Sequence, residues 1–194
     1  MKIGITGHRN QRLNLPEDEN DSAWRPIKRW LILELNIFKE LCTLSNEPLE
    51  LYCGMASGSD VVFALVGRLL KLRYSDNVKL HCVLPCKDYN STHEYFDYIK
   101  SKSDEWVELS DKFYKGCDNV RDQYIVDHAD IIFAIWDGNK SGGVWSTIRK
   151  AQKAGKKIIY CPKELIDSGF ENLLERGIHI RISKYKTNFS NVLP

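Results

Sequence analysis

Short apolar runs alternate with longer amphipathic stretches along most of the chain. Each apolar run ends at Gly, Pro, Asp or Ser, residues that favour turns. This pattern is typical of strands that are buried on both faces of a sheet. The predicted strands are residues 2–6, 49–53, 79–84, 131–136, 157–161 and 178–182.

The stretches between these runs carry apolar residues at helical spacing. In the first long stretch, apolar side chains recur every three or four residues from Trp24 to Phe38, which predicts a helix with one core-facing stripe. Ser22 stands where an N-cap is expected, and Gly155 follows the last predicted helix as a stop. The predicted helices are residues 23–44, 60–73, 119–128 and 144–154.

Strands that alternate with helices of this length indicate an α/β protein. Parallel strands joined by right-handed helical crossovers build a three-layer α/β/α sandwich around a mainly parallel sheet. A chain of 194 residues fits one domain, residues 1–194. Within it we predict a polar tail at 183–194 and an irregular aromatic insertion at 88–116, with a helix at about 92–101 and a strand at 106–109. Such an insertion covers a pocket, contacts a partner or only packs on the surface of the domain.

The charge balance excludes a strong electrostatic attraction to polyanions. With 28 basic and 26 acidic residues, the formal net charge is +2, so charge alone predicts neither nucleic acid nor an anionic membrane as a partner. The first ten residues are too polar for a secretory signal, and no apolar run approaches the ~20 residues of a membrane helix. We therefore expect a soluble cytoplasmic protein without a membrane partner.

The spacing of cysteines and histidines gives no sign of a metal site. The six cysteines include no CxxC pair, which favours buried reduced thiols over metal or disulfide chemistry. His81, His93, His128 and His179 have no metal-ligand spacing to a carboxylate or a thiol. We expect neither a metal nor another cofactor.

Three strand-to-helix junctions are rich in glycine and small residues. They read GITGHR at 4–9, CGMASGSD at 53–60 and WDGNKSGGVW at 136–145. Glycine lets a ligand approach the backbone, and the amides that open the following helix attract an anion. Loops after parallel strands meet at the carboxyl edge of the sheet, where ligands bind. The sequence contains neither the P-loop pattern nor the GxGxxG fingerprint of dinucleotide-binding proteins.

Side chains in and beside these loops suit a phosphate and a sugar. Arg9, Arg121 and Lys140 can donate to phosphate oxygens, and Asp60 or Asp137 can accept from ribose hydroxyls. The candidate ligand-binding residues are Thr6, Gly7, His8, Arg9, Gly54, Ser57, Gly58, Asp60, Arg121, Asp137, Gly138, Ser141, Gly142, Gly143 and Ser146.

Several neighbouring residues allow two interpretations. His8 either donates to a phosphate or acts as an acid, or it is an ordinary turn histidine. Trp136 and Trp145 flank the third loop and either stack on a base or only pack. The run 140–157 contains six basic residues and no acidic one, and it forms either a solvated helix face or a surface that attracts an anionic ligand or nucleic acid.

The loop sequences resemble those of the SLOG superfamily. The resemblance rests on GITG at 4–7, GMASG at 54–58, and the run from Arg121 through Ala129-Asp130 and an apolar strand to Gly142-Gly143. This superfamily joins the DNA-processing protein DprA, the Lonely Guy cytokinin-activating phosphoribohydrolases and the YpsA-like proteins of bacteria and phages. The resemblance covers roughly residues 1–162 and is nearest to the YpsA-like branch.

This resemblance carries several expectations with it. It implies a Rossmann-like fold, a nucleotide or nucleotide-derived small molecule as ligand, and a homo-oligomer, either a dimer or a higher assembly. It also implies a bacterial cytoplasm, or the host cytoplasm if the protein is encoded by a phage.

The catalytic carboxylate of the Lonely Guy enzymes is not matched. Their motif reads PGGxGTxxE, and aligning its paired glycines with Gly142-Gly143 places Arg149 on the glutamate. A cation cannot act as a base or stabilise a ribosyl cation, so this phosphoribohydrolase activity is not expected. Four other carboxylates could do such work if the site placed them near a glycosidic bond: Asp60, Asp122, Asp137 and Glu94.

Three functions follow, in decreasing order of preference. The first is a binding module that captures a nucleotide or a nucleotide-derived signal through the three loops. The second is a nucleotide-processing hydrolase, an N-glycosidase or a phosphoribohydrolase-like enzyme, that uses one of these carboxylates. The third is DprA-like nucleic-acid binding through Lys150, Lys153 and Lys157, which the near-zero net charge disfavours.

Overall fold

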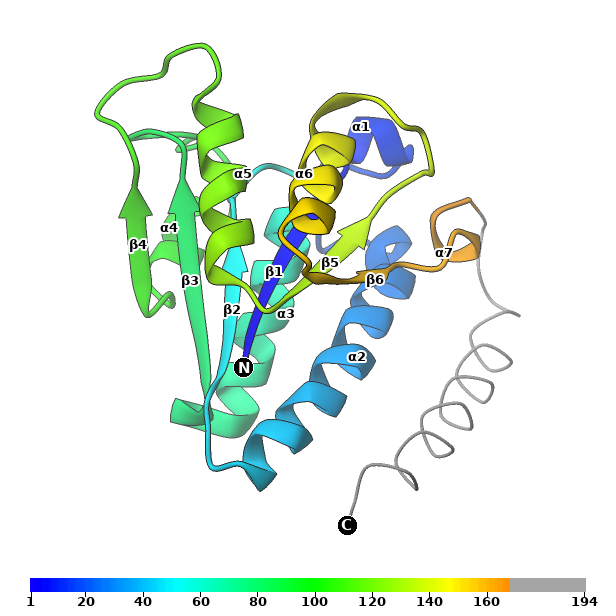
Figure 1. The fold of residues 1–194 in the computed structure, drawn as a ribbon, viewed down its shortest axis with the longest axis vertical. Helices are drawn as coiled ribbons and strands as arrows, with labels where there is room; N and C mark the ends of the chain where they lie inside the picture. The colour runs from blue at the N-terminus through cyan, green and yellow to red at the C-terminus, as the bar shows by residue number, and fades with distance from the viewer. Residues whose placement is uncertain (168–194) are drawn as a thin grey trace.

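A six-stranded sheet forms the centre of the protein in a computed structural model that describes residues 1–167. Every strand pair is parallel, and the strand order is β4-β3-β2-β1-β5-β6 (Figure 1). The strands are β1 (Lys2–Gly7), β2 (Leu49–Cys53), β3 (Val78–Leu84), β4 (Glu105–Glu108), β5 (Ile131–Ile135) and β6 (Lys157–Tyr160). The predicted parallel sheet is therefore confirmed. The predicted strand at 178–182 and the tail at 183–194 lie outside the described residues.

Helices cover both faces of this sheet, as the alternating pattern predicts. α2 (Arg25–Leu44) and α3 (Ser59–Tyr74) pack on one face, and α5 (Cys117–His128) and α6 (Gly142–Lys153) pack on the other (Figure 1). The shorter elements are α1 (Asn10–Leu13), α4 (Phe96–Lys100), α7 (Glu164–Asp167) and the 3-10 turns Ser22–Trp24 and Ser75–Asn77. The fold is the expected three-layer α/β/α sandwich.

The larger hydrophobic core lies between the sheet and the α2–α3 layer. Phe133 of β5 is fully buried there, and its ring lies 5.5, 6.0 and 6.4 Å from the ring centroids of Trp30, Phe38 and Phe63. The apolar residues at three- and four-residue spacing from Trp24 to Phe38 are all buried, so the predicted core-facing stripe is confirmed. These rings come from two helices and a central strand, and they hold this helix layer on the sheet.

The four long helices begin one or two residues from the predicted starts, at Arg25, Ser59, Cys117 and Gly142. The long helix starts at Arg25, after a 3-10 turn that is capped by Asp21 and not by Ser22. The Asp21 carboxylate accepts a hydrogen bond from the Ala23 amide at 2.7 Å. α6 starts at Gly142 and not at residue 144, because glycines add nothing to an apolar pattern.

The segment 88–116, predicted as an irregular insertion, supplies part of the sandwich. It contains α4 and β4, and β4 pairs with β3 at the edge of the sheet. The predicted helix is limited to Phe96–Lys100, and the predicted strand is shifted to Glu105–Glu108. Aromatic packing joins these two elements, since the rings of Phe96 and Trp106 meet edge to face at 5.1 Å.

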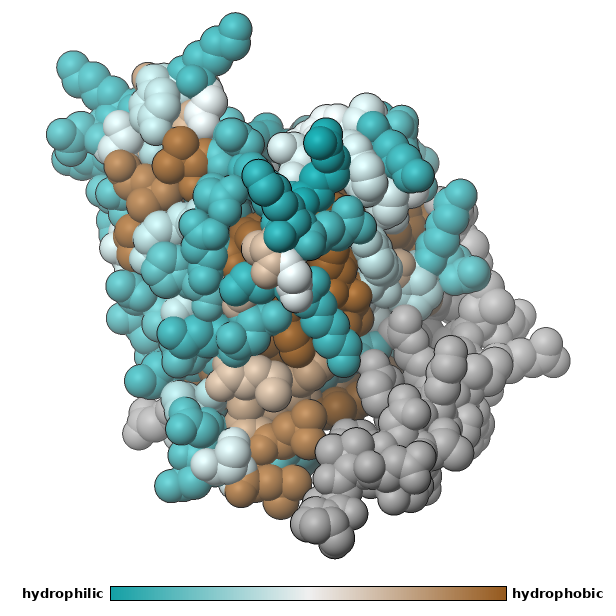
Figure 2. Space-filling view, viewed as in Figure 1, coloured by the Kyte–Doolittle hydropathy of each residue, from teal (hydrophilic) through white to brown (hydrophobic). Residues whose placement is uncertain are grey.

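The surface and the thiols agree with a packed α/β domain. All six cysteines are buried and none forms a disulfide, which confirms the predicted buried thiols. Hydrophilic side chains cover most of the α5–α6 face, with hydrophobic residues between them (Figure 2). Within residues 1–167, no helix combines the length and the apolar character that a membrane span requires.

The direction in which strands are added reverses beside β1. From β1 the chain adds β2, β3 and β4 on one side, and it then places β5 and β6 on the other. The connections after β1 and β5 therefore lead to opposite faces of the sheet. In open parallel sheets, the crevice beyond the carboxyl ends at such a reversal is the usual ligand site.

Replacing Phe133 by Ala tests the aromatic core. The lost ring leaves a cavity between the sheet and the α2–α3 layer, and we expect the free energy of unfolding to fall by about 3–5 kcal/mol. Phe113→Ala is the matched control, because Phe113 is 66% exposed and its loss should change stability by less than about 0.5 kcal/mol. Urea denaturation followed by circular dichroism measures both variants, and equal losses would contradict this description of the core.

Candidate functional site

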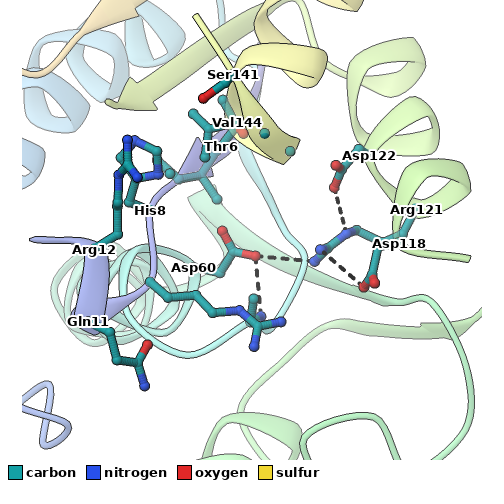
Figure 3. A pocket seen from close by; sticks show the side chains of 16 residues that line it. Thr6, His8, Gln11, Arg12, Asp60, Asp118, Arg121, Asp122, Ser141 and Val144 are labelled. Carbon is teal, nitrogen blue, oxygen red and sulfur yellow. Dashed lines mark hydrogen bonds and ion pairs between the residues drawn. The ribbon is translucent and has the colours of Figure 1, made fainter. Parts of the chain in front are cut away.

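A cavity of about 500 Å³ opens at the carboxyl edge of the sheet beside β1 (Figure 3). The end of β1, α1, the loop before α3, α5 and the start of α6 bound it. Its lining residues are Ile5, Thr6, Gly7, His8, Arg9, Gln11, Arg12, Ala56, Asp60, Asp118, Arg121, Asp122, Ser141, Gly142, Gly143 and Val144. Segments that are distant in sequence meet here because parallel strands end at one edge.

Arg121 of α5 is a buried charge in the wall of this cavity. Only 6% of the residue is exposed. Its Nη1 donates to Asp60 Oδ2 at 3.2 Å, its Nε lies 2.8 Å from Asp122 Oδ1, and its Nη2 lies 3.9 Å from Asp118 Oδ1. The contacts with Asp118 and Asp122 are ion pairs that lack hydrogen-bond alignment. Three carboxylates thus compensate the guanidinium within the protein.

Asp60 lies at the start of α3 and faces the cavity beside Arg121 (Figure 3). Its Oδ2 accepts from Arg121 and from the Ala56 amide, each at 3.2 Å. Its Oδ1 accepts no hydrogen bond from residues 1–167. Burial raises the pKa of Asp60 to about 6, and attraction to Arg121 opposes this rise only in part. Asp60 therefore titrates close to neutral pH and keeps one oxygen available.

His8 and Arg12 lie across the cavity from Arg121 (Figure 3). Both contact the carboxylate of Asp137. His8 Nε2 lies 2.9 Å from Asp137 Oδ1, and Arg12 Nε donates to Asp137 Oδ2 at 2.8 Å. Desolvation raises the pKa of Asp137, but hydrogen bonds from the Asn139 amide, His8 and Arg12 outweigh this effect and bring the pKa down to about 2. Asp137 thus positions these two side chains instead of lining the cavity itself.

Arg9 lines the cavity and forms no ion pair with a carboxylate of the described chain. It is exposed, and its Nη2 donates to the hydroxyl of Tyr89 at 3.1 Å. The guanidinium of Arg121 lies 6.0 Å from the centroid of the same tyrosine ring. Burial raises the pKa of Tyr89, so its hydroxyl stays neutral. The positive charge of Arg9 helps to lower the pKa of Asp60, so the two groups attract each other without forming an ion pair.

The start of α6 presents free backbone amides to the cavity. The N-cap residue Ser141 makes no side-chain hydrogen bond to the helix, because its hydroxyl donates to Asn139 Oδ1, and the first turn contains no acidic residue. Gly142, with φ at +79°, and Gly143 line the cavity, and a Cβ on either would meet no described atom within 4 Å. The first amides therefore lie at the positive end of the helix dipole beside open space.

The predicted ligand-binding residues divide into two groups. Those on the cavity are Thr6, Gly7, His8, Arg9, Asp60, Arg121, Ser141, Gly142 and Gly143, and those outside it are Gly54, Ser57, Gly58, Asp137, Gly138 and Ser146. The second loop explains part of this division. Arg121 covers Gly54, and the Gly58 amide donates to the buried Glu19 at 2.7 Å. Glycines here serve the packing of the chain against itself.

The four candidate catalytic carboxylates also fall into two groups, on the cavity and outside it. Asp60 and Asp122 line the cavity, whereas Asp137 lies behind His8 and Arg12 and Glu94 lines a different cavity. Arg149, at the position of the Lonely Guy glutamate, is exposed on α6. In the part of the chain that the structure describes, no group of three or more His, Cys, Asp or Glu residues is arranged to hold a metal ion.

Trp136 and Trp145 contact each other and not the cavity. Their rings stack at a centroid distance of 5.4 Å with 13° between the planes, and Trp136 also contacts Tyr160 at 6.0 Å. Neither tryptophan lines the cavity. The structure therefore shows the packing role of these rings.

Sequence reasoning missed three polar residues of the cavity: Gln11, Arg12 and Asp118. Gln11 and Arg12 lie on α1, a helix of four residues that is too short to show a periodic pattern. Asp118 precedes Arg121 by one turn of α5, and this i, i+3 spacing of opposite charges was the available signal.

Comparisons with known proteins yield a neighbour in fold. No protein-family profile and no curated protein sequence matches the chain. Among solved structures, that of DNA processing protein A (DprA) from Streptococcus pneumoniae is similar, with a TM-score of 0.53 and 15% identity over 94% of this chain. The fold is Rossmann-like. This chain spans 56% of the DprA chain, and a likeness at this identity shows the fold alone. The Rossmann-like fold agrees with the fold that the SLOG resemblance implies. The placement of the chain in the YpsA-like branch stays a prediction.

The packing of Gly54 against Arg121 offers a test of the buried ion-pair cluster. A Cβ on residue 54 would overlap Arg121 Nη1, so Gly54→Ala must displace the guanidinium from Asp60. We expect the free energy of unfolding to fall by about 3–5 kcal/mol, as when a buried charge loses its partner. Gly143→Ala is the control, because its Cβ meets open space, and it should change stability by less than about 1 kcal/mol. Similar urea midpoints for the two variants would contradict this arrangement.

Proposed function

We propose that the cavity beside β1 binds a nucleotide or a nucleotide-derived small molecule, with a phosphate between Arg9 and the first amides of α6. The observation that carries this proposal is that one cavity combines an arginine that forms no ion pair within residues 1–167 with a helix N-terminus that has no side-chain cap. Both are donors suited to phosphate oxygens. The volume of about 500 Å³ is also in the range of small-molecule sites.

The acidic side of the cavity supports a sugar as the second part of this ligand. Asp60 Oδ1 is without a donor in the described chain, and a carboxylate oxygen accepts readily from a ribose hydroxyl. Arg121 holds Asp60 in place and is itself surrounded by carboxylates. In this proposal the phosphate therefore contacts Arg9, and Arg121 acts as a positioning residue.

The SLOG resemblance supports the same class of ligand. We include in the proposal the placement of the chain in that superfamily, its YpsA-like branch and a homo-oligomeric state, which that resemblance implies. The Rossmann-like fold shared with DprA is compatible with this placement.

Substitution of Arg9 tests the phosphate site. Mass spectrometry of small molecules released from the purified protein identifies a co-purifying ligand, and nucleoside mono-, di- and triphosphates serve as probes in calorimetric titrations. We expect Arg9→Gln to weaken nucleotide binding by about ten- to a hundredfold, because a charge-assisted hydrogen bond contributes about 1.5–3 kcal/mol. The exposed position of Arg9 predicts unchanged stability.

Arg29→Gln is the matched control for this experiment. It removes the same charge from an exposed position on α2, away from the cavity, and should leave nucleotide affinity unchanged. Equal weakening in the two variants would contradict a phosphate site at Arg9. Salt-dependent binding of single-stranded DNA without nucleotide binding would favour the nucleic-acid alternative instead.

A second candidate function is hydrolysis of the N-glycosidic bond of the bound nucleotide. The observation that favours it is a buried carboxylate on the cavity, Asp60, whose pKa is raised to about 6. A group that titrates near neutral pH is suited to act as a general base toward water. Water would add to the C1′ carbon of the ribose as the bond to the base breaks, which yields the free base and ribose phosphate.

Asp60→Asn tests this candidate. We expect the variant to lose turnover and to retain nucleotide binding, and the rate of the unmodified protein should rise with pH through about 6 as Asp60 loses its proton. Chromatography of the products measures the rate, and circular dichroism checks folding. Asp111→Asn, at an exposed position, is the control. Recovery of only intact nucleotide from the unmodified protein would exclude hydrolysis and leave binding as the function.

A further inference from the structure

A second cavity, of about 520 Å³, lies beside α1 and shares Gln11 with the first. It is bounded by α1, by the loops that follow α1 and β2, and by the segment between β3 and α4. Its lining residues are Asn10, Gln11, Glu17, Asp18, Ser57, Asn90, Thr92, His93 and Glu94. The proposed nucleotide site makes no use of it.

Hydrogen bonds between separate loops hold the walls of this cavity in place. The fully buried Glu19 accepts from the Gly58 amide at 2.7 Å and lies 3.2 Å from His93 Nε2. The side-chain amide of Asn90 donates to the Met55 carbonyl at 2.9 Å. These contacts join three loops, so the cavity is formed by the protein itself and does not depend on a ligand for its shape.

Polar groups on the walls have no partner in the protein. Asn10 is only 3% exposed, yet its side-chain amide forms no hydrogen bond within residues 1–167. The amide atoms of Asn10 are not fully enclosed by the protein, so they can bond to water or to a ligand in the cavity. The hydroxyls of Ser57 and Thr92 likewise have no hydrogen-bond partner in the described chain.

The charge of the lining restricts which ligand fits. Glu17, Asp18 and Glu94 line the cavity, and none of its described lining residues is Lys or Arg. Glu17 and Glu94 form no ion pair with any residue in 1–167. His93 can carry a positive charge, but its Nε2 is directed to Glu19. The cavity therefore repels phosphate and attracts a cation.

We propose that this second cavity binds an organic cation that carries primary amino groups. An ammonium group donates three hydrogen bonds, and the carboxylates of Glu17 and Glu94, the Asn10 amide oxygen and the two hydroxyl oxygens can accept them. A diamine places one ammonium group near the exposed carboxylates and the other toward Asn10. This assignment goes beyond the proposed nucleotide site, because its ligand has the opposite charge.

Isothermal titration calorimetry of the full chain with putrescine (1,4-diaminobutane) tests the proposal, with D-ribose as an uncharged ligand rich in hydroxyls. We expect putrescine to bind and ribose not to bind. The double variant Glu17→Gln/Glu94→Gln should lose at least about tenfold in putrescine affinity, and so should Asn10→Leu, which removes the buried acceptor. Circular dichroism checks that Asn10→Leu folds, and the double variant changes only exposed side chains.

The double variant Glu40→Gln/Glu47→Gln is the matched control, because it removes the same charge from exposed positions outside the cavity. It should bind putrescine as the unmodified protein does. Equal weakening in the two double variants would reduce the effect to overall charge and overturn the proposal, as would ribose binding without putrescine binding. No nucleotide enters these titrations, so their outcome is independent of the proposed nucleotide site.

Discussion

The burial of Arg121 constrains the geometry around the first cavity more than any other contact. A guanidinium removed from water requires compensating carboxylates; Asp60 comes from α3, and Asp118 and Asp122 come from the arginine's own helix. The contact with Asp60 joins α3, on one face of the sheet, to α5, on the other. Gly54 leaves the room that the guanidinium occupies. The glycine-rich loop after β2 thus accommodates an arginine from a distant helix.

This arrangement gives the cavity two sides of unlike character. Because three aspartates neutralise Arg121, the donors toward an anion are Arg9 and the first amides of α6, while Asp60 Oδ1 remains an acceptor. A ligand with one phosphate and several hydroxyls matches both sides. Beyond Gln11, the second cavity offers acceptors and carboxylates. In the two proposals, the region around α1 separates a site for an anion from one for a cation.

The parts of the fold that could be predicted are those with a strong local pattern. The stripe from Trp24 to Phe38 and the apolar run at β5 indicate burial directly, and parallel strands bring their following loops to one edge. α1 could not be predicted, because four residues show no period, and Arg12 was missed with it. The sequence could not decide between Asp21 and Ser22 as the capping residue, since both residue types favour that position.

The sequence by itself determined the α/β class, the parallel sheet and the edge at which the cavity lies, because the hydrophobic period and the alternation of strands with helices are properties of the chain. Only the tertiary structure decided which polar groups remain free. The Gly58 amide is taken by Glu19, 39 residues away, and Asp137 is held by His8 across 129 residues. Arg9 forms no ion pair within residues 1–167. Whether a group can bind a ligand depends on its burial and its partners, and contacts between distant segments set both.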